Sequence, residues 1–422
     1  MNSKIDVSAR RRPEILAPAG DFVCLQAALD AGADAVYFGL GRFNMRARSG
    51  VNFKVDDLPE ISRRCRARSV KAYLTLNAIM FEGERAAVEE TVSAAKDYID
   101  AVIAADWGVI EICKKLGVAF HVSTQMSTSN SAAAAFLAAQ GAERVVLARE
   151  CTLSEVAAIH AELGGRIELE CFVHGAQCVA ESGRCFMSHE VFGKSACRGE
   201  CNQPCRRRFL VKAVDLYEDA EGRPVHEGRT EFFVEPHTVL SARDLCSLGF
   251  VDRLMAAGIS SFKIEGRARN AEYVMTCVRA YRRAVDAVLA GEYTPALVEE
   301  LTCEVKKVFH REFAPGLYFG RPGAGQFTDS EDSLSTTVKR HIGIVLDYFL
   351  KAGIAQVKIQ DHSIRPGDDI QIHGPTTGVV ELKVGELHRD EERPEIGEKG
   401  TWVTFKCPRC RVGDKVFFIE RR

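Results

Sequence analysis

The fold of this chain is constrained most by a regular alternation of short apolar segments with longer stretches of helical periodicity. Segments typical of buried β-strands lie at 14–18, 35–40, 71–79, 101–105, 119–124, 144–148, 167–173 and 261–265. Continuous apolar strands joined by helices are typical of parallel sheets that are buried on both faces. Eight such units within roughly the first 290 residues therefore predict a (β/α)8 barrel of the TIM type and not an open sheet.

The pattern divides the chain into this barrel and a second, all-β domain. We expect the barrel at 1–290, with a cysteine-rich insertion at about 176–246 in place of the helix between the last two strands. A connecting segment with a stretch rich in Gly and Pro follows at 291–340. In 341–422 helical patterns give way to short strands and turn signals, which predict a small C-terminal β-barrel. Loops after the strands form the catalytic face of a TIM-type barrel, so the insertion is expected on that face.

Charge and hydropathy limit the classes of protein that fit this chain. The formal net charge is −2, so the whole molecule is not an obvious binder of polyanions. No stretch reaches the ~20 apolar residues that a membrane span needs. The polar, basic N-terminus is not followed by the apolar run of a signal peptide. We therefore expect a cytoplasmic protein with no membrane partner.

Cysteines are concentrated in the insertion. Five of the 15 fall within 28 residues, namely Cys178, Cys185, Cys197, Cys201 and Cys205. Clustered thiols in a reducing compartment usually bind metal, and thiolate-only ligand sets favour an iron–sulfur cluster or zinc, which spacing alone does not separate. A basic triplet directly follows the last thiol, and it is either a solvated turn or a patch that contacts RNA phosphates: Arg206, Arg207 and Arg208.

Polar residues gather where the predicted strands end, and we expect them to line one pocket. The candidate catalytic residues are His174, Glu170 and Glu265. The candidate substrate-binding residues are Arg46, Gln125, Arg149, Lys263 and Arg267. A pocket with Arg and Lys suits a dicarboxylate, because a guanidinium can bind a carboxylate through two hydrogen bonds. Each of these side chains could instead form a salt bridge or cap at the barrel rim, and His174 could be a hydrogen-bonded structural residue.

Six motifs carry a resemblance to a known family. They are PEILAPAG at 13–20, AVYFG at 35–39, STQMS at 123–127, ECFVHGA at 170–176, SGRC at 182–185 and KIEGR at 263–267. Together they resemble peptidase family U32, the collagenase-like peptidases, over about residues 13–340. The C-terminal β domain also resembles the C-terminal domain of that family.

The resemblance implies a function that the residues alone do not select. Size and domain plan are most similar to the group of tRNA hydroxylation protein P, which implies prephenate-dependent 5-hydroxylation of the tRNA wobble uridine. The expected partners are then tRNA, prephenate and, as an option, a second family member. Sister groups hydroxylate a ribosomal RNA cytidine or act in ubiquinone synthesis, and some members were called collagenases.

The resemblance also implies a [4Fe–4S] cluster. By motif its ligands are Cys178, Cys185, Cys201 and Cys246, with Cys205 as a rival fourth ligand; zinc is the alternative metal. A peptidase remains open, although an HExxH motif fails at 189–193 and a GxSxG motif is absent from the sequence. A Cys178–His174 nucleophile pair would also fit that class, and a cluster-carrying scaffold without its own activity is a further option.

Overall fold

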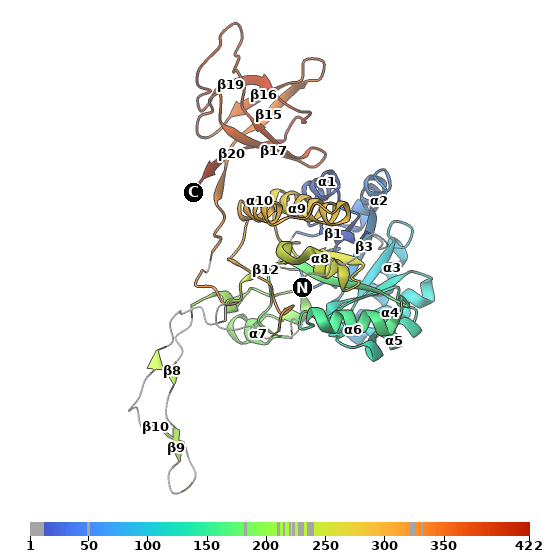
Figure 1. The fold of residues 1–422 in the computed structure, drawn as a ribbon. Coiled ribbons are helices and arrows are strands. Elements are labelled where there is room, and N and C mark those ends of the chain that lie inside the picture. Colours follow the sequence, from blue (N-terminus) through green and yellow to red (C-terminus); the bar gives the residue numbers. More distant parts are fainter. Residues whose placement is uncertain are drawn as a thin grey trace.

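A computed structural model describes residues 12–48, 51–180, 184–208, 240–320, 326–330 and 332–422, and within 209–239 only Glu221 and the backbone of four short strands. Its main body is the predicted barrel (Figure 1). The barrel strands are β1 (Glu14–Pro18), β2 (Ala35–Phe38), β3 (Lys71–Leu76), β4 (Ala101–Ala104), β5 (Phe120–Val122), β6 (Arg144–Val146), β7 (Glu168–Gly175) and β13 (Ser261–Ile264). Neighbouring strands pair in parallel from β1 to β7, and β13 pairs with both β7 and β1, so the sheet closes on itself.

Helices surround this sheet. They are α1 (Phe22–Asp30), α2 (Leu58–Arg66), α3 (Arg85–Ala95), α4 (Trp107–Leu116), α5 (Ser131–Ala139), α6 (Leu153–Leu163), α8 (Val251–Ala256) and α9 (Ala271–Ala290). Five of these eight, α1, α4, α5, α6 and α9, begin at side-chain caps. Asp21 caps α1 by accepting a hydrogen bond from the backbone N–H of Cys24. Asn270 caps α9 in the same way through the N–H of Tyr273, and Gly291 ends that helix in the left-handed conformation.

The insertion between β7 and β13 contains regular structure of its own. It holds α7 (Met187–Phe192), the antiparallel pair β9 (Leu216–Glu218) and β10 (Pro224–His226), and the pair β8 (Lys212–Ala213) and β11 (Phe232–Phe233). It ends in β12 (Asp244–Cys246), which runs antiparallel to β7. The short helix α8 then leads into β13, so the helix that the insertion was expected to replace is present in shortened form.

The insertion is tied to the loops that follow β2 and β3. The N–H of Arg48 donates to the carbonyl of Gly199 over 3.2 Å, and the N–H of Ile79 donates to that of Cys197 over 3.3 Å. Gly199 has a φ of 81°, and a Cβ at this position would come within 2.2 Å of the Asn44 carbonyl oxygen. This close approach requires glycine, and it holds the insertion across the ends of the barrel strands.

After the barrel strands, the chain runs through a connecting segment into the second domain. Helix α10 (Pro295–Lys306) packs on α9, and β14 (Phe313–Ala314) pairs with β12. The C-terminal domain is all-β, as predicted, and forms a six-stranded antiparallel sheet in the order β18-β17-β20-β15-β16-β19. These strands are β15 (Thr337–Phe349), β16 (Ile354–Ile359), β17 (Asp369–Gly374), β18 (Gly378–Lys383), β19 (Trp402–Lys406) and β20 (Lys415–Arg421), packed around a separate apolar core.

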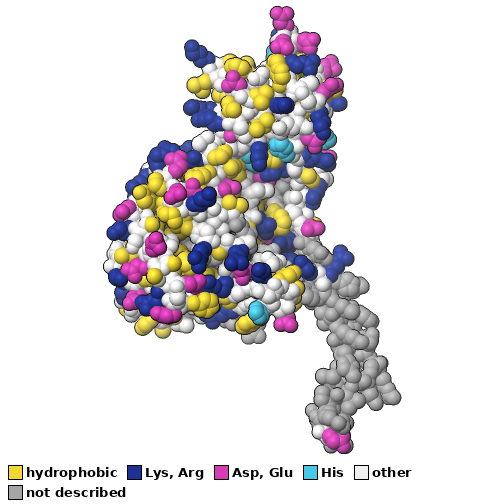
Figure 2. Space-filling view, turned by 180° about the vertical axis from the view of Figure 1, so that it is seen from behind, with side chains coloured by type: hydrophobic (Ala, Val, Ile, Leu, Met, Phe, Trp, Pro, Cys, Tyr) yellow, Lys and Arg dark blue, Asp and Glu magenta, His cyan; other side chains and the backbone are white. Residues whose placement is uncertain are grey.

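Strand β18 fastens this domain to the barrel. It lies against α1 and α9, and Val379 joins the apolar core of the barrel. In the view of Figure 2, basic and acidic side chains are interspersed over the visible face of the barrel, in keeping with the small net charge. Within the described residues, none of the helices combines the length and the apolar character needed to cross a bilayer.

Candidate functional site

A pocket opens at the mouth of the barrel, under the insertion, as the sequence predicted for the catalytic face. It encloses about 1150 Å³ of empty space, part of which is open to solvent. Five cations and one carboxylate line it, namely Arg46, Arg149, Arg206, Lys263, Arg267 and Glu265. Gln125 also lines it. The excess of positive charge favours a bound anion.

Arg267 is the cation most available to an anion. It is 8% exposed, and its guanidinium donates to Asn44 Oδ1 over 3.0 Å and to Thr75 Oγ1 over 2.8 Å. Both partners are neutral, so their hydrogen bonds leave the charge uncompensated. Burial lowers the pKa of Arg267 to about 10, which still leaves the group protonated at neutral pH. A carboxylate in the pocket would supply the missing negative charge.

Arg149 stands between the main pocket and a smaller cavity of about 430 Å³ that shares four of its lining residues. The guanidinium lies 4.1 Å from the centre of the Phe172 ring and donates to the carbonyl of Ala176 over 3.5 Å. Stacking on an aromatic ring holds a guanidinium flat while leaving its edge free to bind. Arg149 is therefore positioned to orient an anionic ligand.

Lys263 and Glu170 form a buried ion pair beneath the pocket floor. Lys263 Nζ lies 2.7 Å from Glu170 Oε1, and Arg144 lies 3.2 Å from the other oxygen of this fully buried carboxylate. Burial opposes ionisation of Glu170, but the charges of Lys263 and Arg144 outweigh it and lower the pKa of the carboxyl. Burial also lowers the pKa of Lys263, which Glu170 offsets only in part. Glu170 thus serves as a counter-ion below the pocket and not as a group facing the ligand.

Glu265 is held by Arg46 at the pocket wall. The two side chains are 2.9 Å apart. Although burial opposes its ionisation, the charges of Arg46 and Arg269 lower the pKa of Glu265 to about 2. A carboxyl with this pKa carries no proton at neutral pH, so it does not serve as a general acid there.

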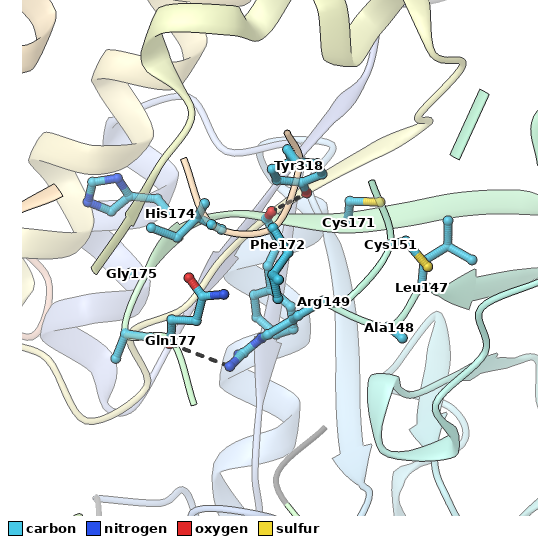
Figure 3. Close-up of a pocket in the computed structure, with 14 residues that line it drawn as sticks. Leu147, Ala148, Arg149, Cys151, Cys171, Phe172, His174, Gly175, Gln177 and Tyr318 are labelled. Carbon is cyan, nitrogen blue, oxygen red and sulfur yellow. Dashed lines mark hydrogen bonds between the residues drawn. The ribbon is translucent and has the colours of Figure 1, made fainter. Parts of the chain in front are cut away.

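His174 lies outside the main pocket, in contrast to its expected catalytic role, and borders only the smaller cavity beside it. Its ring is 1% exposed and packs against Tyr273, Tyr281 and Phe313. Figure 3 shows the imidazole directed away from Arg149 and Gln177. Burial lowers the pKa of His174 to about 3, so the ring is neutral. The structure therefore favours the alternative of a structural histidine between β7 and α9.

Four thiols line the same pocket, and they differ from the expected set in one member. Cys178, Cys185, Cys201 and Cys205 all border it. Cys205 is close enough to the other three that, after burial, their charges contribute to raising the pKa of its thiol. Cys246 lies instead on β12, opposite His174, where its partly buried sulfur contacts the Tyr281 hydroxyl at 4.0 Å. The rival fourth ligand Cys205 therefore borders the pocket with Cys178, Cys185 and Cys201, whereas Cys246 is not among the residues that line it.

The arrangement of these thiols bears on the kind of metal they suit. Among the described residues, no three Cys, His, Asp or Glu side chains are grouped as the ligands of one metal ion. The ligands of a four-iron cube surround a larger object than the ligands of a single zinc ion do. The four thiols that border the pocket supply the donor chemistry that such a cluster needs.

The three arginines of the basic triplet differ in exposure. Arg206 is buried and donates to the carbonyls of Gln177 and Ala242, so it holds the insertion to the barrel and is unavailable to RNA. Arg207 and Arg208 are exposed. The Arg207 guanidinium lies 4.9 Å from the centre of the Phe192 ring. The expected patch therefore loses its first member.

Sequence reasoning missed several neutral polar groups of the pocket. Tyr37, Thr75, Asn77 and Ser123 line it from β2, from β3 and from the loops after β3 and β5. Thr75 and Asn77 had a visible signal, because each is a polar residue at the end of an apolar strand. Tyr37 had none, since an aromatic residue in a strand is equally typical of a core.

The fold and this site define a class of TIM-barrel proteins with a cationic pocket bordered by four thiols. The model of peptidase family U32 matches residues 20–328, and the chain belongs to this family. The chain is 36% identical over 420 residues to a protein named Collagenase from Porphyromonas gingivalis, covering 97% of this chain and 98% of that one. It is 32% identical to tRNA hydroxylation protein P1 of Bacillus subtilis over 368 residues, covering 86% and 84% of the two chains. A 23S rRNA 5-hydroxycytidine synthase of Escherichia coli is 35% identical over 80% of this chain, which spans 50% of that protein.

Proposed function

We propose that this chain is an RNA hydroxylase that acts on the wobble uridine of tRNA, with prephenate as cosubstrate. The observation that carries the proposal is the pocket itself, which combines an excess of buried cations with four thiols at the mouth of the barrel. Relatives named for tRNA and ribosomal RNA hydroxylation support this choice of reaction.

The pocket would bind the dicarboxylate through its free cations. Arg267 and Arg149 offer guanidinium groups that no carboxylate of the pocket wall neutralises by a direct hydrogen bond. Arg46 and Glu265 hold one another and so would shape the wall. The role of these side chains is to bind and orient the anion and to exclude water while the base enters from above.

We propose Cys178, Cys185, Cys201 and Cys205 as the ligands of a [4Fe–4S] cluster. Bound there, the cluster would supply electron transfer or a binding position for an oxygen-bearing ligand. Arg206 would support this role by pinning the loop that carries Cys205 to the carbonyls of Gln177 and Ala242.

A peptidase is the second candidate, because relatives of similar length are named Collagenase and protease. A thiol peptidase needs a cysteine beside a histidine that can accept its proton. Cys178 borders the pocket while His174 is packed against α9, so the two do not form that pair. Cys246 does face His174, but burial raises the pKa of its thiol to about 11, which leaves it un-ionised.

The test uses the full chain purified without oxygen. Iron, sulfide and zinc are quantified together with the visible absorption spectrum, and the protein is then incubated with prephenate and unmodified tRNA. Mass spectrometry of the nucleosides should reveal a uridine that has gained one oxygen atom. About one zinc per chain, no sulfide and cleavage of a collagen-type peptide would instead establish the peptidase.

A further inference from the structure

The pocket is rimmed by exposed aromatic rings, which the chemistry inside it does not use. Phe186 is 84% exposed, although Cys185 and Met187 on either side of it line the pocket. Phe81, in the loop after β3, is 60% exposed and lies a few residues beyond Asn77, which also lines the pocket. Rings this exposed gain little from burial, and both stand at the point where a large substrate would enter.

Arginine side chains stack on the rings of this rim. The Arg198 guanidinium lies 4.7 Å from the centre of the Phe81 ring, and that of Arg207 lies 4.9 Å from the centre of the Phe192 ring. Both arginines come from the insertion. Glu84 lies 2.6 Å from the Arg198 guanidinium and compensates its charge, so Arg198 orders the Phe81 ring without offering free charge. The stacked guanidinium of Arg207 presents a flat, positively charged surface, on which a nucleobase can lie or which a phosphate can approach.

Exposed cations accompany the rings on the insertion. Arg184 precedes Cys185, and Lys194 and Arg207 lie on either side of the segment that ends at Cys205. Within the part of the chain that the structure describes, none of the three is in an ion pair with a carboxylate. Flat rings combined with free positive charge are complementary to unpaired nucleotides, whose bases stack and whose phosphates are anionic.

We infer that this rim, with Phe186 as its central ring, is a stacking platform that accepts RNA as an unpaired loop. The inference rests on the proposed function and adds to it the surface that receives the RNA loop. In a duplex each base already stacks on its neighbours and cannot enter a pocket, whereas a splayed loop can place one base inside and the next on Phe186. The platform therefore selects loops over helices without reading a sequence.

The experiment measures RNA binding by fluorescence anisotropy with the full chain. The probes are a hairpin with a seven-nucleotide loop and the same strand annealed to its complement. Phe186→Ala is compared with the wild type, with Phe186→Trp as the conservative rescue. Phe349→Ala is the matched control, because Phe349 is 46% exposed on the C-terminal domain. Thermal unfolding of each variant verifies that the surface change leaves the fold intact.

We expect Phe186→Ala to weaken hairpin binding by at least fivefold, since stacking of one base on an aromatic side chain contributes a factor of about five or more. The dependence on salt should stay the same, because no charge is lost. Phe186→Trp should restore affinity, Phe349→Ala should match the wild type, and duplex binding should be weaker and insensitive to Phe186.

Several results would overturn the inference. Equal hairpin affinity of Phe186→Ala and wild type would do so, as would an equal loss for duplex and hairpin, or no RNA binding by the wild type. A loss confined to a collagen-type peptide would reassign the rim to peptide binding. Nucleoside analysis of the same samples separates the two proposals: loop binding that depends on Phe186, without a hydroxylated uridine, would refute the proposed reaction and leave the platform standing.

Discussion

Replacement of Lys263 by Met tests the buried charge network beneath the pocket. Methionine is close to lysine in length but removes the ammonium that lies 2.7 Å from Glu170. The carboxylate is fully buried and would keep only Arg144, at 3.2 Å. Removing one partner of a buried ion pair typically lowers the free energy of unfolding by about 3–5 kcal/mol. Because Arg144 remains beside the carboxylate, we expect a loss of about 3 kcal/mol for Lys263→Met. Chemical unfolding followed by circular dichroism should show the loss in the midpoint of the barrel transition.

The double variant Lys263→Met/Glu170→Gln is the matched control. The glutamine side chain introduced by Glu170→Gln is neutral, so it leaves no uncompensated charge when Lys263 is absent. The double variant should therefore recover more than half of the stability that Lys263→Met loses. Arg144 keeps Glu14 and Glu168 as partners in both proteins, at 2.5 and 2.6 Å. A double variant no more stable than the single one would show that the loss comes from packing and not from charge.

The pH dependence of this effect has a definite sign. In the wild type the pKa of Glu170 is lowered, so its contribution to stability is present above the unfolded-state pKa and is lost as pH falls through the folded-state pKa. Without Lys263, burial raises that pKa, and the side chain takes up a proton as pH falls. The stability gap between the two proteins should therefore narrow toward acid pH. An unchanged gap from neutral to acid pH, or no gap at all, would refute the reasoning.

Four further predictions concern the pocket and the insertion. Arg267→Gln should weaken prephenate binding at least tenfold in calorimetry, with Arg267→Lys intermediate; wild-type affinity would remove this guanidinium from the anion site. Cys205→Ser should lose most of its iron and sulfide, whereas Cys246→Ser should retain them, and the reverse result would restore the motif-based ligand set. Arg206→Ala should lower the thermal midpoint without changing the salt dependence of RNA binding, because its guanidinium is bound to carbonyl groups. Arg207→Ala should lower the slope of log affinity against log salt by about 1, and an unchanged slope would exclude a phosphate contact.

The barrel could be predicted from the sequence because each strand is short, apolar and buried on both sides. Strand β2, for example, has four consecutive buried residues, and the sequence shows this as the apolar run Ala35–Phe38. The elements β12 and α8 could not be predicted in this way. Both are brief, at 3 and 6 residues, and β12 is held by pairing with β7, some 70 positions earlier in the chain, which local periodicity does not reveal.

The site was predictable at the level of strands but not at the level of side-chain direction. Arg267 and Arg149 follow strand ends and do enter the pocket. His174 belongs to a strand that also reaches the mouth, yet its side chain points outward to α9. Likewise, Cys246 and Cys205 are equivalent by residue type, and only the path of the insertion decides that Cys205 joins the other three thiols.

The contact between β18 and α1 affects the order in which parts of the protein can complete their folding. The turn before Val379 approaches α1 so closely that a Cβ on Gly378, whose φ is 68°, would lie 3.0 Å from an Asp30 oxygen and 3.3 Å from the Ala27 nitrogen. Helix α1 is thus covered by a strand that is synthesised roughly 350 residues later. Until β18 has been made, the flank of α1 lacks this partner, and a nascent chain halted before residue 378 would present a ready surface to chaperones.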